Sequence, residues 1–509
     1  MKKTILLLLA LCFTSMMFAD NFVMIKVKNQ QNLKELFNKQ DLNIHYYNDN
    51  FVLATSEDLN ENMILLDENS FENNDLYFIV YCEKGEQQNY IERENVEVLF
   101  SNDDLLVVKP LADELNPAKN DGMIAVYNKT SKLAQSTRDI PSTIEESQSI
   151  RGFMNEVSIE NLTNTVQYLQ DYGRRQWNTS QAYEAGQWIY EQFENLGLDV
   201  EEFPFTYKGN PSSPNIIATQ WGTEYPDKFI VCGSHYDSER AGDGGQDCPG
   251  ADDNATGVAS VLETARILSE YEFEYSIVYC AFSAEEIGLI GSEAYASFCA
   301  ELGYDIVAYF NNDMNGYLHP GNEIHVDLIY PNNVAVLGDY YKNVAGIYFP
   351  EMEVRHIEFT KGDSDHTSFN NNGYMGIYPF EDKDNYSPYI HTLNDVIGVS
   401  VNSFEQSQRF TQMNLACVAT LAGLLNENVM ENEYNYVKIF PNPAKNTLTL
   451  TAETEGMKGV NIVNSLGQIV KDFSFETSTT IDIRDLNSGV YFVKILGDNV
   501  ITKKIVVRN

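Results

Sequence analysis

Positively charged side chains are scarce in this sequence. Its 509 residues include 34 lysines and arginines against 74 aspartates and glutamates, which gives a formal net charge of −40. A chain this acidic repels phosphate backbones and anionic lipid headgroups. We therefore exclude nucleic acid and anionic membrane surfaces as partners.

Cysteines and long apolar runs are also scarce. The seven cysteines are scattered without close pairs, which is too sparse for a disulfide framework in a chain of this length, although one or two bridges stay open. The apolar run Ile5–Phe13 follows Met1-Lys2-Lys3 and precedes Ala19, which is the pattern of a signal peptide over residues 1–19. Because no later segment is long and apolar enough to span a bilayer, we expect export without a transmembrane segment.

The composition changes along the chain, and its length predicts more than one domain. Residues 20–150 combine strand-like runs, such as Phe22–Val27 and Leu76–Tyr81, with polar connections, and they contain no cluster of histidine and acidic side chains. This pattern predicts a small α+β domain that ends in a polar linker at residues 135–149. We interpret the domain as a pro-region, with an accessory domain as the alternative.

Residues 151–428 have the pattern of an α/β domain. Apolar residues recur at helical spacing from Ala185 to Leu196, and Gly197 stands where a helix C-terminal glycine is expected. Helical stretches alternate with short apolar runs at residues 229–232, 276–282, 306–310 and 375–378. This alternation predicts a mostly parallel, twisted sheet flanked by helices.

Residues 434–509 contain short runs in which apolar and polar residues alternate, and turn residues separate these runs. This pattern predicts a small antiparallel β-sandwich.

Acidic and histidine side chains directly follow the predicted strands of the central domain. These residues are His235, Asp237, Glu285, Glu286 and Asp313. In open α/β sheets, groups at the carboxyl ends of separate strands converge on one crevice. Taken alone, a histidine or acidic side chain of this kind is more often a solvated or capping group than a ligand. Asp252 and Asp253, taken alone, could merely cap the helix that follows them. Their joint occurrence at successive strand ends predicts one site.

Six motifs within residues 155–425 resemble the bacterial leucyl-aminopeptidase type of zinc exopeptidase, a family with two co-catalytic zinc ions. All six occur in the order of that family: Gly233-Ser-His-Tyr-Asp237, Pro249-Gly-Ala-Asp-Asp-Asn254, Phe282-Ser-Ala-Glu-Glu-Ile-Gly-Leu289, Asn312-Asp-Met314, Ser364-Asp-His366 and Ile390-His-Thr392. The resemblance implies the zinc exopeptidase fold, two Zn²⁺ per chain and a secreted aminopeptidase that acts on peptides or proteins.

The resemblance also implies the metal ligands, which are His235, Asp253, Glu286, Asp313 and His391. Asp253 would bridge the two zinc ions, since the family ligand stands three residues after the glycine, here Gly250. Glu286 and His391 would complete one zinc site, and the remaining two ligands would complete the other. Two imidazoles and three carboxylates suit zinc, which accepts nitrogen and oxygen ligands.

Four more residues receive roles from the same resemblance. Glu285 would be the general base that takes a proton from the water between the metals, which attacks as a bridging hydroxide. Asp237 would hold the imidazole of His235 in the correct tautomer. Asp365 and His366, in the Ser364-Asp-His366 motif, are expected to line the substrate pocket.

Three alternatives stay open from the sequence. A glutaminyl-cyclase-like acyltransferase resembles this family but usually holds one zinc, so the metal stoichiometry separates the two. A carboxypeptidase needs cationic groups to hold a substrate carboxylate, and Arg240, Arg355 and Lys361 are available. A non-catalytic binding protein on the same fold is disfavoured, because all five ligands and Glu285 are present.

The C-terminal residues resemble a second family. They contain Phe440-Pro-Asn-Pro443, Asn464-Ser-Leu-Gly467, Leu486-Asn-Ser-Gly-Val-Tyr491, Lys503-Lys504 and Arg508. These features are similar to the C-terminal sorting domain of the type IX secretion route. The resemblance implies a secreted or cell-surface protein whose partners include the outer-membrane secretion machinery.

Overall fold

The structure is a computed structural model of the chain. It describes residues 20–507 except 69, 72–75, 83–84, 86, 93–94, 112–121, 135–139, 240–247, 358–362, 426–436, 442–443, 453–457, 465–468, 488 and 497–500. The predicted signal peptide at residues 1–19 lies outside the described residues, as do part of the predicted linker, parts of the C-terminal motifs, Arg240 and Lys361. Within the described part of the chain, no helix has the length and apolar character needed to cross a membrane.

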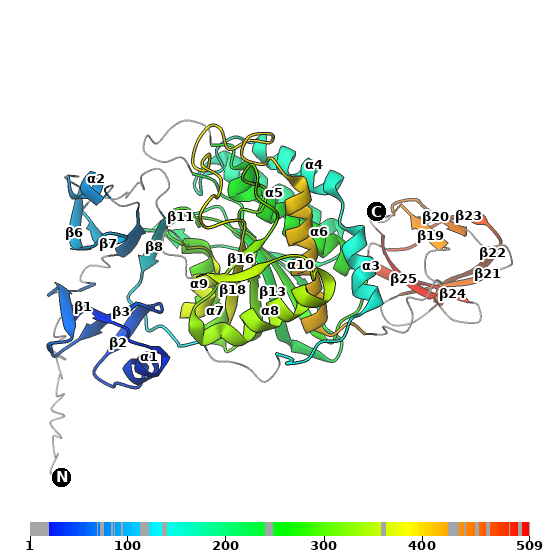
Figure 1. Ribbon diagram of the computed structural model, residues 1–509. Coiled ribbons are helices and arrows are strands. Elements are labelled where there is room, and N and C mark those ends of the chain that lie inside the picture. Colours follow the sequence, from blue (N-terminus) through cyan, green and yellow to red (C-terminus); the bar gives the residue numbers. More distant parts are fainter. Residues whose placement is uncertain are drawn as a thin grey trace, which may run out of the picture.

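The N-terminal region consists of two antiparallel four-stranded sheets, drawn in blue in Figure 1. The first sheet has the order β2-β3-β1-β4, with strands Asn43–Tyr47, Phe51–Ser56, Asn21–Lys26 and Met63–Asp67. The second has the order β6-β7-β5-β8, with strands Val96–Ser101, Leu105–Pro110, Tyr77–Tyr81 and Gly122–Val126. Helices α1 (Gln30–Phe37) and α2 (Gln87–Ile91) accompany them, and an apolar core that includes Phe22 and Val107 joins the two sheets.

The central domain is built on an eight-stranded mixed sheet of order β17-β16-β18-β15-β13-β14-β12-β9. In that order the strands are Val354–Ile357, Val326–Ile329, Gly376–Phe380, Asp305–Asn311, Tyr225–His235, Tyr275–Phe282, Asn215–Gln220 and Asp199–Phe203. Its four middle strands, β18, β15, β13 and β14, are parallel neighbours, whereas β12, β9 and β16 pair antiparallel with their inner neighbours. The α/β prediction is confirmed, and the predicted parallel arrangement holds in the centre of the sheet. A short hairpin, β10 (Thr206–Tyr207) and β11 (Asn210–Pro211), lies outside the sheet.

Helices cover both faces of this sheet (Figure 1). They are α3 (Gln148–Glu156), α4 (Ile159–Gln170), α5 (Ser180–Asn195), α6 (Thr256–Leu268), α7 (Ile290–Leu302), α8 (Ala335–Tyr348), α9 (His366–Asn371) and α10 (Phe404–Ala422). Successive side chains of a strand point to opposite faces, so Ile230 packs in a core with α4, α5, α6, α8 and α10, whereas Val231 packs in a core with α7 and α9. Both faces of the middle strands are therefore buried, as expected for a parallel sheet.

The C-terminal region forms two small antiparallel sheets at the far end of the central domain (Figure 1). One has the order β19-β20-β23, with strands Val437–Phe440, Thr447–Ala452 and Ser478–Asp482. The other has the order β22-β21-β24-β25, with strands Ile469–Phe475, Lys458–Asn464, Gly489–Leu496 and Ile501–Val507. Leu448 and Leu450 share one core with Val460, Ile462 and Val493, so the two sheets pack face to face as a sandwich.

The N-terminal region packs directly on the central domain. The backbone N–H of Ala125 donates to the carbonyl of Gly288 at 3.1 Å, and the N–H of Lys132 donates to Asn371 at 2.8 Å. Lys129 also forms an ion pair with Glu293 at the start of α7. These contacts place the second N-terminal sheet against the loop between β14 and α7.

A buried histidine connects strand β2 to the segment after β8. The Nδ1 atom of His45 lies 2.8 Å from the carbonyl oxygen of Lys129, and its Nε2 atom lies 3.0 Å from Thr55 Oγ1. Burial lowers the pKa of His45 to about 4. The unfolded chain then binds a proton that the folded chain does not bind, so this histidine makes the protein less stable as the pH falls from about 6.5 towards 4.

Replacing His45 with glutamine should remove this contribution to the pH dependence of stability. Between pH 7 and pH 5, the free energy of unfolding of the wild type should fall by about 2 kcal/mol more than that of His45→Gln. Urea denaturation of both proteins at the two pH values measures the difference. Equal falls in the two proteins would contradict the buried, neutral state of His45.

Candidate metal centre

The predicted site residues stand at one edge of the central sheet. Strand β13 ends at His235, and the loops after β14 and β15 carry Glu285 and Asp313. In the parallel register, His235 is the partner of Phe282, the last residue of β14. The carboxyl ends of the middle strands therefore lie together, and the polar side chains that follow them meet in one place.

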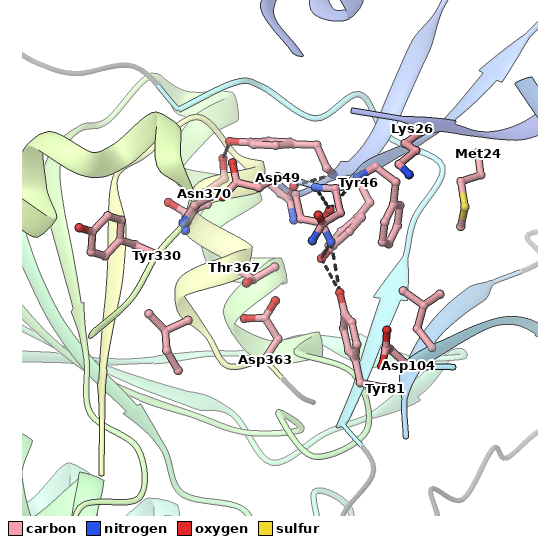
Figure 2. A pocket seen from close by; sticks show the side chains of 18 of the residues that line it. Met24, Lys26, Tyr46, Asp49, Tyr81, Asp104, Tyr330, Asp363, Thr367 and Asn370 are labelled. Atoms are coloured by element: carbon pink, nitrogen blue, oxygen red, sulfur yellow. Dashed lines mark hydrogen bonds between the residues drawn. The ribbon is translucent and has the colours of Figure 1, made fainter. Parts of the chain in front are cut away.

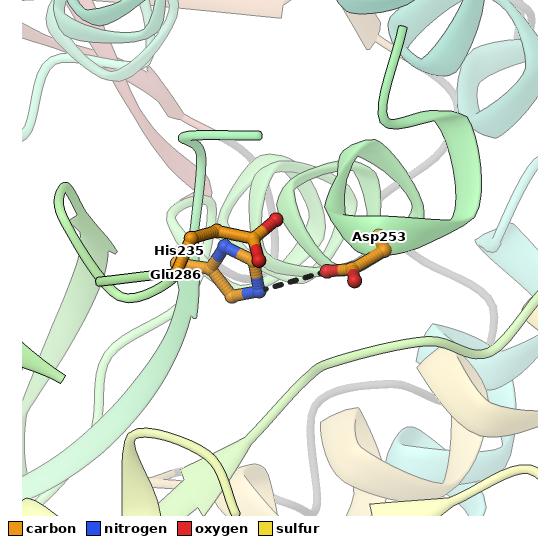
Figure 3. Close-up of side chains that lie close together, drawn as sticks. All are labelled: His235, Asp253 and Glu286. Carbon is orange, nitrogen blue, oxygen red and sulfur yellow. Dashed lines mark ion pairs between the residues drawn. The ribbon is translucent and has the colours of Figure 1, made fainter. Parts of the chain in front are cut away.

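The carboxylate of Asp253 lies between two imidazoles. Its Oδ1 atom is 3.3 Å from the Nε2 atom of His235, and its Oδ2 atom is 3.1 Å from the Nε2 atom of His391. Figure 3 shows Asp253 on the segment before α6, with its carboxylate directed towards the imidazole of His235 and with Glu286 beside that imidazole. One carboxylate thus presents one oxygen to each histidine.

Each imidazole also faces a second carboxylate. The Nε2 atom of His391 is 2.7 Å from Glu286 Oε2. The Nε2 atom of His235 is 3.4 Å from Asp313 Oδ1 and 4.0 Å from Glu285 Oε2. The site therefore contains two adjacent groups of nitrogen and oxygen atoms that share Asp253.

Asp237 and Ser364 support this arrangement from behind. The Asp237 carboxylate accepts hydrogen bonds from the backbone N–H groups of Glu285 at 3.1 Å and Glu286 at 3.4 Å. The Nδ1 atom of His235 lies 3.2 Å from the carbonyl oxygen of Asp237 and 3.6 Å from its carboxylate. Ser364 Oγ donates to Asp313 Oδ2 at 2.7 Å. The Asp237 carboxylate thus holds the loop that carries the glutamates, and its role in fixing the tautomer of His235 stays a prediction.

Three residues at or next to the candidate site residues have a strained backbone. Ala284, Met314 and His391 have φ angles of 60°, 49° and 54°, in the left-handed region that side chains other than glycine rarely adopt. Such conformations cost on the order of 1–3 kcal/mol each and persist only where the surrounding structure imposes them. Here they turn the chain sharply at the loops that hold Glu285, Asp313 and His391 itself.

Burial and crowding in the site shift the pKa values of its side chains. Burial, followed by the charge of Asp253, raises the pKa of Glu286 to about 8, and burial also raises the pKa of Asp313 and of Glu285. Burial acts to raise the pKa of Asp253 as well, but the two neighbouring histidines outweigh burial and lower it. The carboxylates outnumber the imidazoles, so the pocket favours additional positive charge.

The donor atoms fit a divalent metal such as zinc. The Nε2 atom of His235 and the Oδ1 atom of Asp313 are buried and have no hydrogen-bond partner among the described residues. Potential ligand atoms of His235, Asp253 and Glu286 lie within 4.8 Å of one another, as do those of His235, Glu285 and Asp313. Zinc binds imidazole nitrogen and carboxylate oxygen, and it would neutralise the excess negative charge.

Asp365 and His366 are buried and do not belong to the groups of potential metal ligands among the described residues. Asp365 is fully buried, and His366 is 2% exposed. The ring of His366 lies 5.4 Å from the ring of Tyr378, and its side chain borders a cavity next to Asp363. Their expected role in substrate binding stays a prediction.

Sequence reasoning missed two residues that hold the site together, Arg175 and Asp395. Arg175 is fully buried and donates hydrogen bonds to the carbonyl oxygens of Tyr236 and Gly250, at the two loops that carry His235 and Asp253. Asp395 accepts a hydrogen bond from the backbone N–H of Asp253 at 3.1 Å. An acidic residue shortly after a candidate ligand was a signal for Asp395, whereas no local pattern marks Arg175.

Comparison with known proteins is consistent with this geometry. Residues 215–415 match peptidase family M28, and residues 438–508 match the secretion system C-terminal sorting domain. The chain contains a peptidase family M28 domain. The resemblance to zinc exopeptidases and to a sorting domain is therefore confirmed.

Several known proteins are similar to this chain at low identity. The chain is 27% identical over 312 residues to leucine aminopeptidase 1 of Leptosphaeria maculans, covering 57% of this chain and 78% of the relative. It is 26% identical over 297 residues to a probable zinc metalloprotease of Pyrenophora tritici-repentis, and this match covers 47% of this chain and 67% of the relative. LapB from Legionella pneumophila has a similar structure, with a TM-score of 0.55, 20% identity and coverage of 68% of this chain and 99% of LapB. The M28 domain makes this chain a metallopeptidase, and the match to LapB shows a shared fold.

Proposed function

We propose that the chain is a secreted aminopeptidase that binds two zinc ions and removes N-terminal residues from peptides. The position of the Asp253 carboxylate carries this proposal, because its two oxygens face the Nε2 atoms of His235 and His391 at 3.3 and 3.1 Å. One shared carboxylate between two groups of ligands is the arrangement expected for two neighbouring metals. The similarity to leucine aminopeptidase 1 of Leptosphaeria maculans supports the choice of an aminopeptidase.

Glu285 is the residue we propose as the general base. Glu285 is 8% exposed, its Oε2 atom lies 4.0 Å from His235 Nε2, and its backbone N–H donates to Asp237. Zinc, when bound, would polarise the scissile carbonyl and make water more acidic. Glu285 would accept the proton of the attacking water and pass it to the leaving amine. Burial raises the pKa of this carboxyl, which favours its acceptance of a proton.

We propose that an apolar cluster beside the candidate metal centre contacts the first residue of the substrate. It consists of Met314, Ile329, Tyr378, Phe380 and Ile390, and Ile357 and Tyr386 pack against it. Met314 and Ile390 directly follow and precede the candidate ligands Asp313 and His391. We therefore propose a preference for apolar N-terminal residues, whose free ammonium group the excess of carboxylates would attract.

The position of Arg355 disfavours the carboxypeptidase alternative. Its Nε atom donates to Asp327 Oδ1 at 2.7 Å, and its Nη2 atom lies 2.6 Å from the Nε2 atom of His325. Arg175 is fully buried and bonded to backbone carbonyls. Both arginines therefore already have partners within the protein.

Substitutions at the two adjacent glutamates test the proposed mechanism. Glu285→Gln should fold, keep both zinc ions and lose kcat by a factor of about 10²–10⁴, because the amide keeps the shape of the side chain but cannot accept a proton. Glu286→Gln should instead bind one zinc more weakly, so excess zinc should restore part of its activity. Elemental analysis and kinetics with apolar aminoacyl chromogenic substrates measure both effects.

The outcomes of this experiment separate the hypotheses. A Glu285→Gln variant that loses a zinc, or keeps most of its activity, would show that the base and the ligand have been assigned wrongly. A wild-type stoichiometry of one zinc per chain would favour the glutaminyl-cyclase-like alternative.

We propose that residues 20–150 are a pro-region that restricts access to the M28 domain. The support is their packing on the segment that carries the catalytic glutamates: Phe78 shares a core with Ala284, Ile287 and Ile290. A cavity of about 540 Å³ lies between the N-terminal region and the central domain. Figure 2 shows Tyr46 and Tyr81 at this cavity on one side and Asp363, Thr367 and Asn370 on the other.

Cutting the chain between the N-terminal region and the M28 domain tests the pro-region proposal. A specific protease site inserted at residues 135–139 would allow release of the N-terminal region from the folded protein. The value of kcat/KM for a peptide should rise after cutting and separation, since the covering region is gone. Unchanged or reduced kcat/KM would support the accessory-domain interpretation instead.

We propose that the C-terminal region directs the protein to the outside of the cell through the type IX route. The match of residues 438–508 to a secretion system C-terminal sorting domain supports this proposal. A chain that lacks residues 434–509 should be an active peptidase that stays within the cell envelope, because the M28 domain has its own core. Cell fractionation with activity assays measures the distribution, and normal secretion of the truncated chain would contradict the proposal.

A further inference from the structure

Two buried side chains bind the backbone of residues 249–253, the segment that leads to Asp253. Arg175 binds its first two carbonyl oxygens, those of Pro249 at 2.6 Å and Gly250 at 2.9 Å. Asp395 binds its last two N–H groups, those of Asp252 at 2.8 Å and Asp253 at 3.1 Å. The position of the shared carboxylate thus depends on one buried cation and one buried anion.

Arg175 connects this segment to the end of strand β13. Its Nε atom donates to the carbonyl oxygen of Tyr236 at 2.8 Å, one residue after His235. Its backbone N–H donates to Ser238 Oγ at 3.0 Å, and that hydroxyl donates to the carbonyl oxygen of Cys248 at 2.8 Å. One guanidinium group therefore bonds to both loops that supply the His235–Asp253 pair.

The close approach of Arg175 requires a glycine at position 250. Gly250 has a φ of 55°, and a Cβ atom there would overlap the side chain of Ser238 and lie 2.9 Å from the Nη2 atom of Arg175. Arg175 is among the largest of the fully buried side chains in the described structure, and its side chain donates hydrogen bonds to carbonyl oxygens there. Its charge is balanced at longer range by Asp395, Asp237 and Asp253.

Asp395 makes the equivalent connection on the side of His391. Besides its two carboxylate contacts, its carbonyl oxygen accepts a hydrogen bond from the N–H of Ala251 at 3.1 Å. Its own N–H donates to the carbonyl oxygen of Thr392, the residue after His391, at 3.2 Å. Asp395 is fully buried, so these contacts are shielded from water.

We propose that Arg175 and Asp395 are positioning residues that each set one of the two distances between Asp253 and an imidazole. Arg175 fixes the separation of Asp253 from His235, and Asp395 fixes its separation from His391. The inference rests on the proposed metal centre, since these separations determine whether a metal ion can contact both side chains of a pair. Loss of either contact should therefore weaken metal binding on one side of Asp253 more than on the other.

Conservative substitutions in the full chain test this division of roles. Arg175→Lys keeps the charge but cannot reach all the carbonyl oxygens, and Asp395→Asn keeps the shape but loses one acceptor. Each variant should bind one of two zinc ions about 10–100-fold more weakly than the wild type, the usual effect of removing a group that orients a metal ligand. Competition with a chromogenic chelator measures both affinities without an activity assay.

Anomalous diffraction from crystals at limiting zinc identifies the weakened side. Arg175→Lys should lose the metal beside His235, and Asp395→Asn should lose the metal beside His391. Arg266→Lys and Asp67→Asn are matched controls, because Arg266 pairs with Glu263 and Asp67 pairs with Lys109, outside the groups of potential metal ligands. Both controls should keep wild-type affinities.

If Arg175→Lys does not fold, Ser238→Ala tests the same side by removing only the hydroxyl that links Arg175 to Cys248. Folded variants with two wild-type affinities would overturn the inference, as would equal weakening of both sites in each variant. A wild-type chain that binds no zinc would instead contradict the metal centre itself, so the two failures are distinguishable.

Discussion

The crowding of carboxylates around two imidazoles in a buried pocket is the constraint on which the rest of the site depends. Asp253, Glu285, Glu286 and Asp313 are each less than a tenth exposed, and water therefore does little to stabilise their charges. Burial of a charged group is costly unless an opposite charge or a metal compensates it. A pair of divalent cations would supply this compensation, which is why the arrangement suits a metal centre better than an acid–base site.

The fold meets this constraint by using rigid elements around short, strained loops. The parallel strands β13, β14 and β15 bring their carboxyl ends to one edge, and left-handed residues such as Ala284 and Met314 turn the chain there. Buried polar groups then fix each loop: Asp237 holds the glutamate loop, and Ser364 holds Asp313. Precision at the centre therefore comes from hydrogen bonds to the backbone as much as from the ligands.

The sequence was sufficient for the parts of the fold and site that are encoded locally. Helices α5 and α6 and the middle strands follow from apolar periodicity, and His235, Glu286 and Asp313 stand at or shortly after the ends of those strands. Asp253 and His391 follow only from the family resemblance. The antiparallel edge strands of the sheet depend on long-range pairing that periodicity does not specify. At the start of α6, Asn254 Oδ1, rather than a carboxylate of Asp252 or Asp253, accepts the N–H of Gly257. Arg175 was not predictable, since its partners are carbonyl oxygens far away in the sequence.

The proposed mechanism depends on the sharing of Asp253 by two metal ions. Anomalous diffraction at the zinc absorption edge, from crystals of the zinc-loaded wild-type protein, would locate these ions. We expect two peaks, one on each side of the Asp253 carboxylate, with His235 beside one peak and His391 beside the other. A single peak, or two peaks that do not share Asp253, would contradict the proposed mechanism.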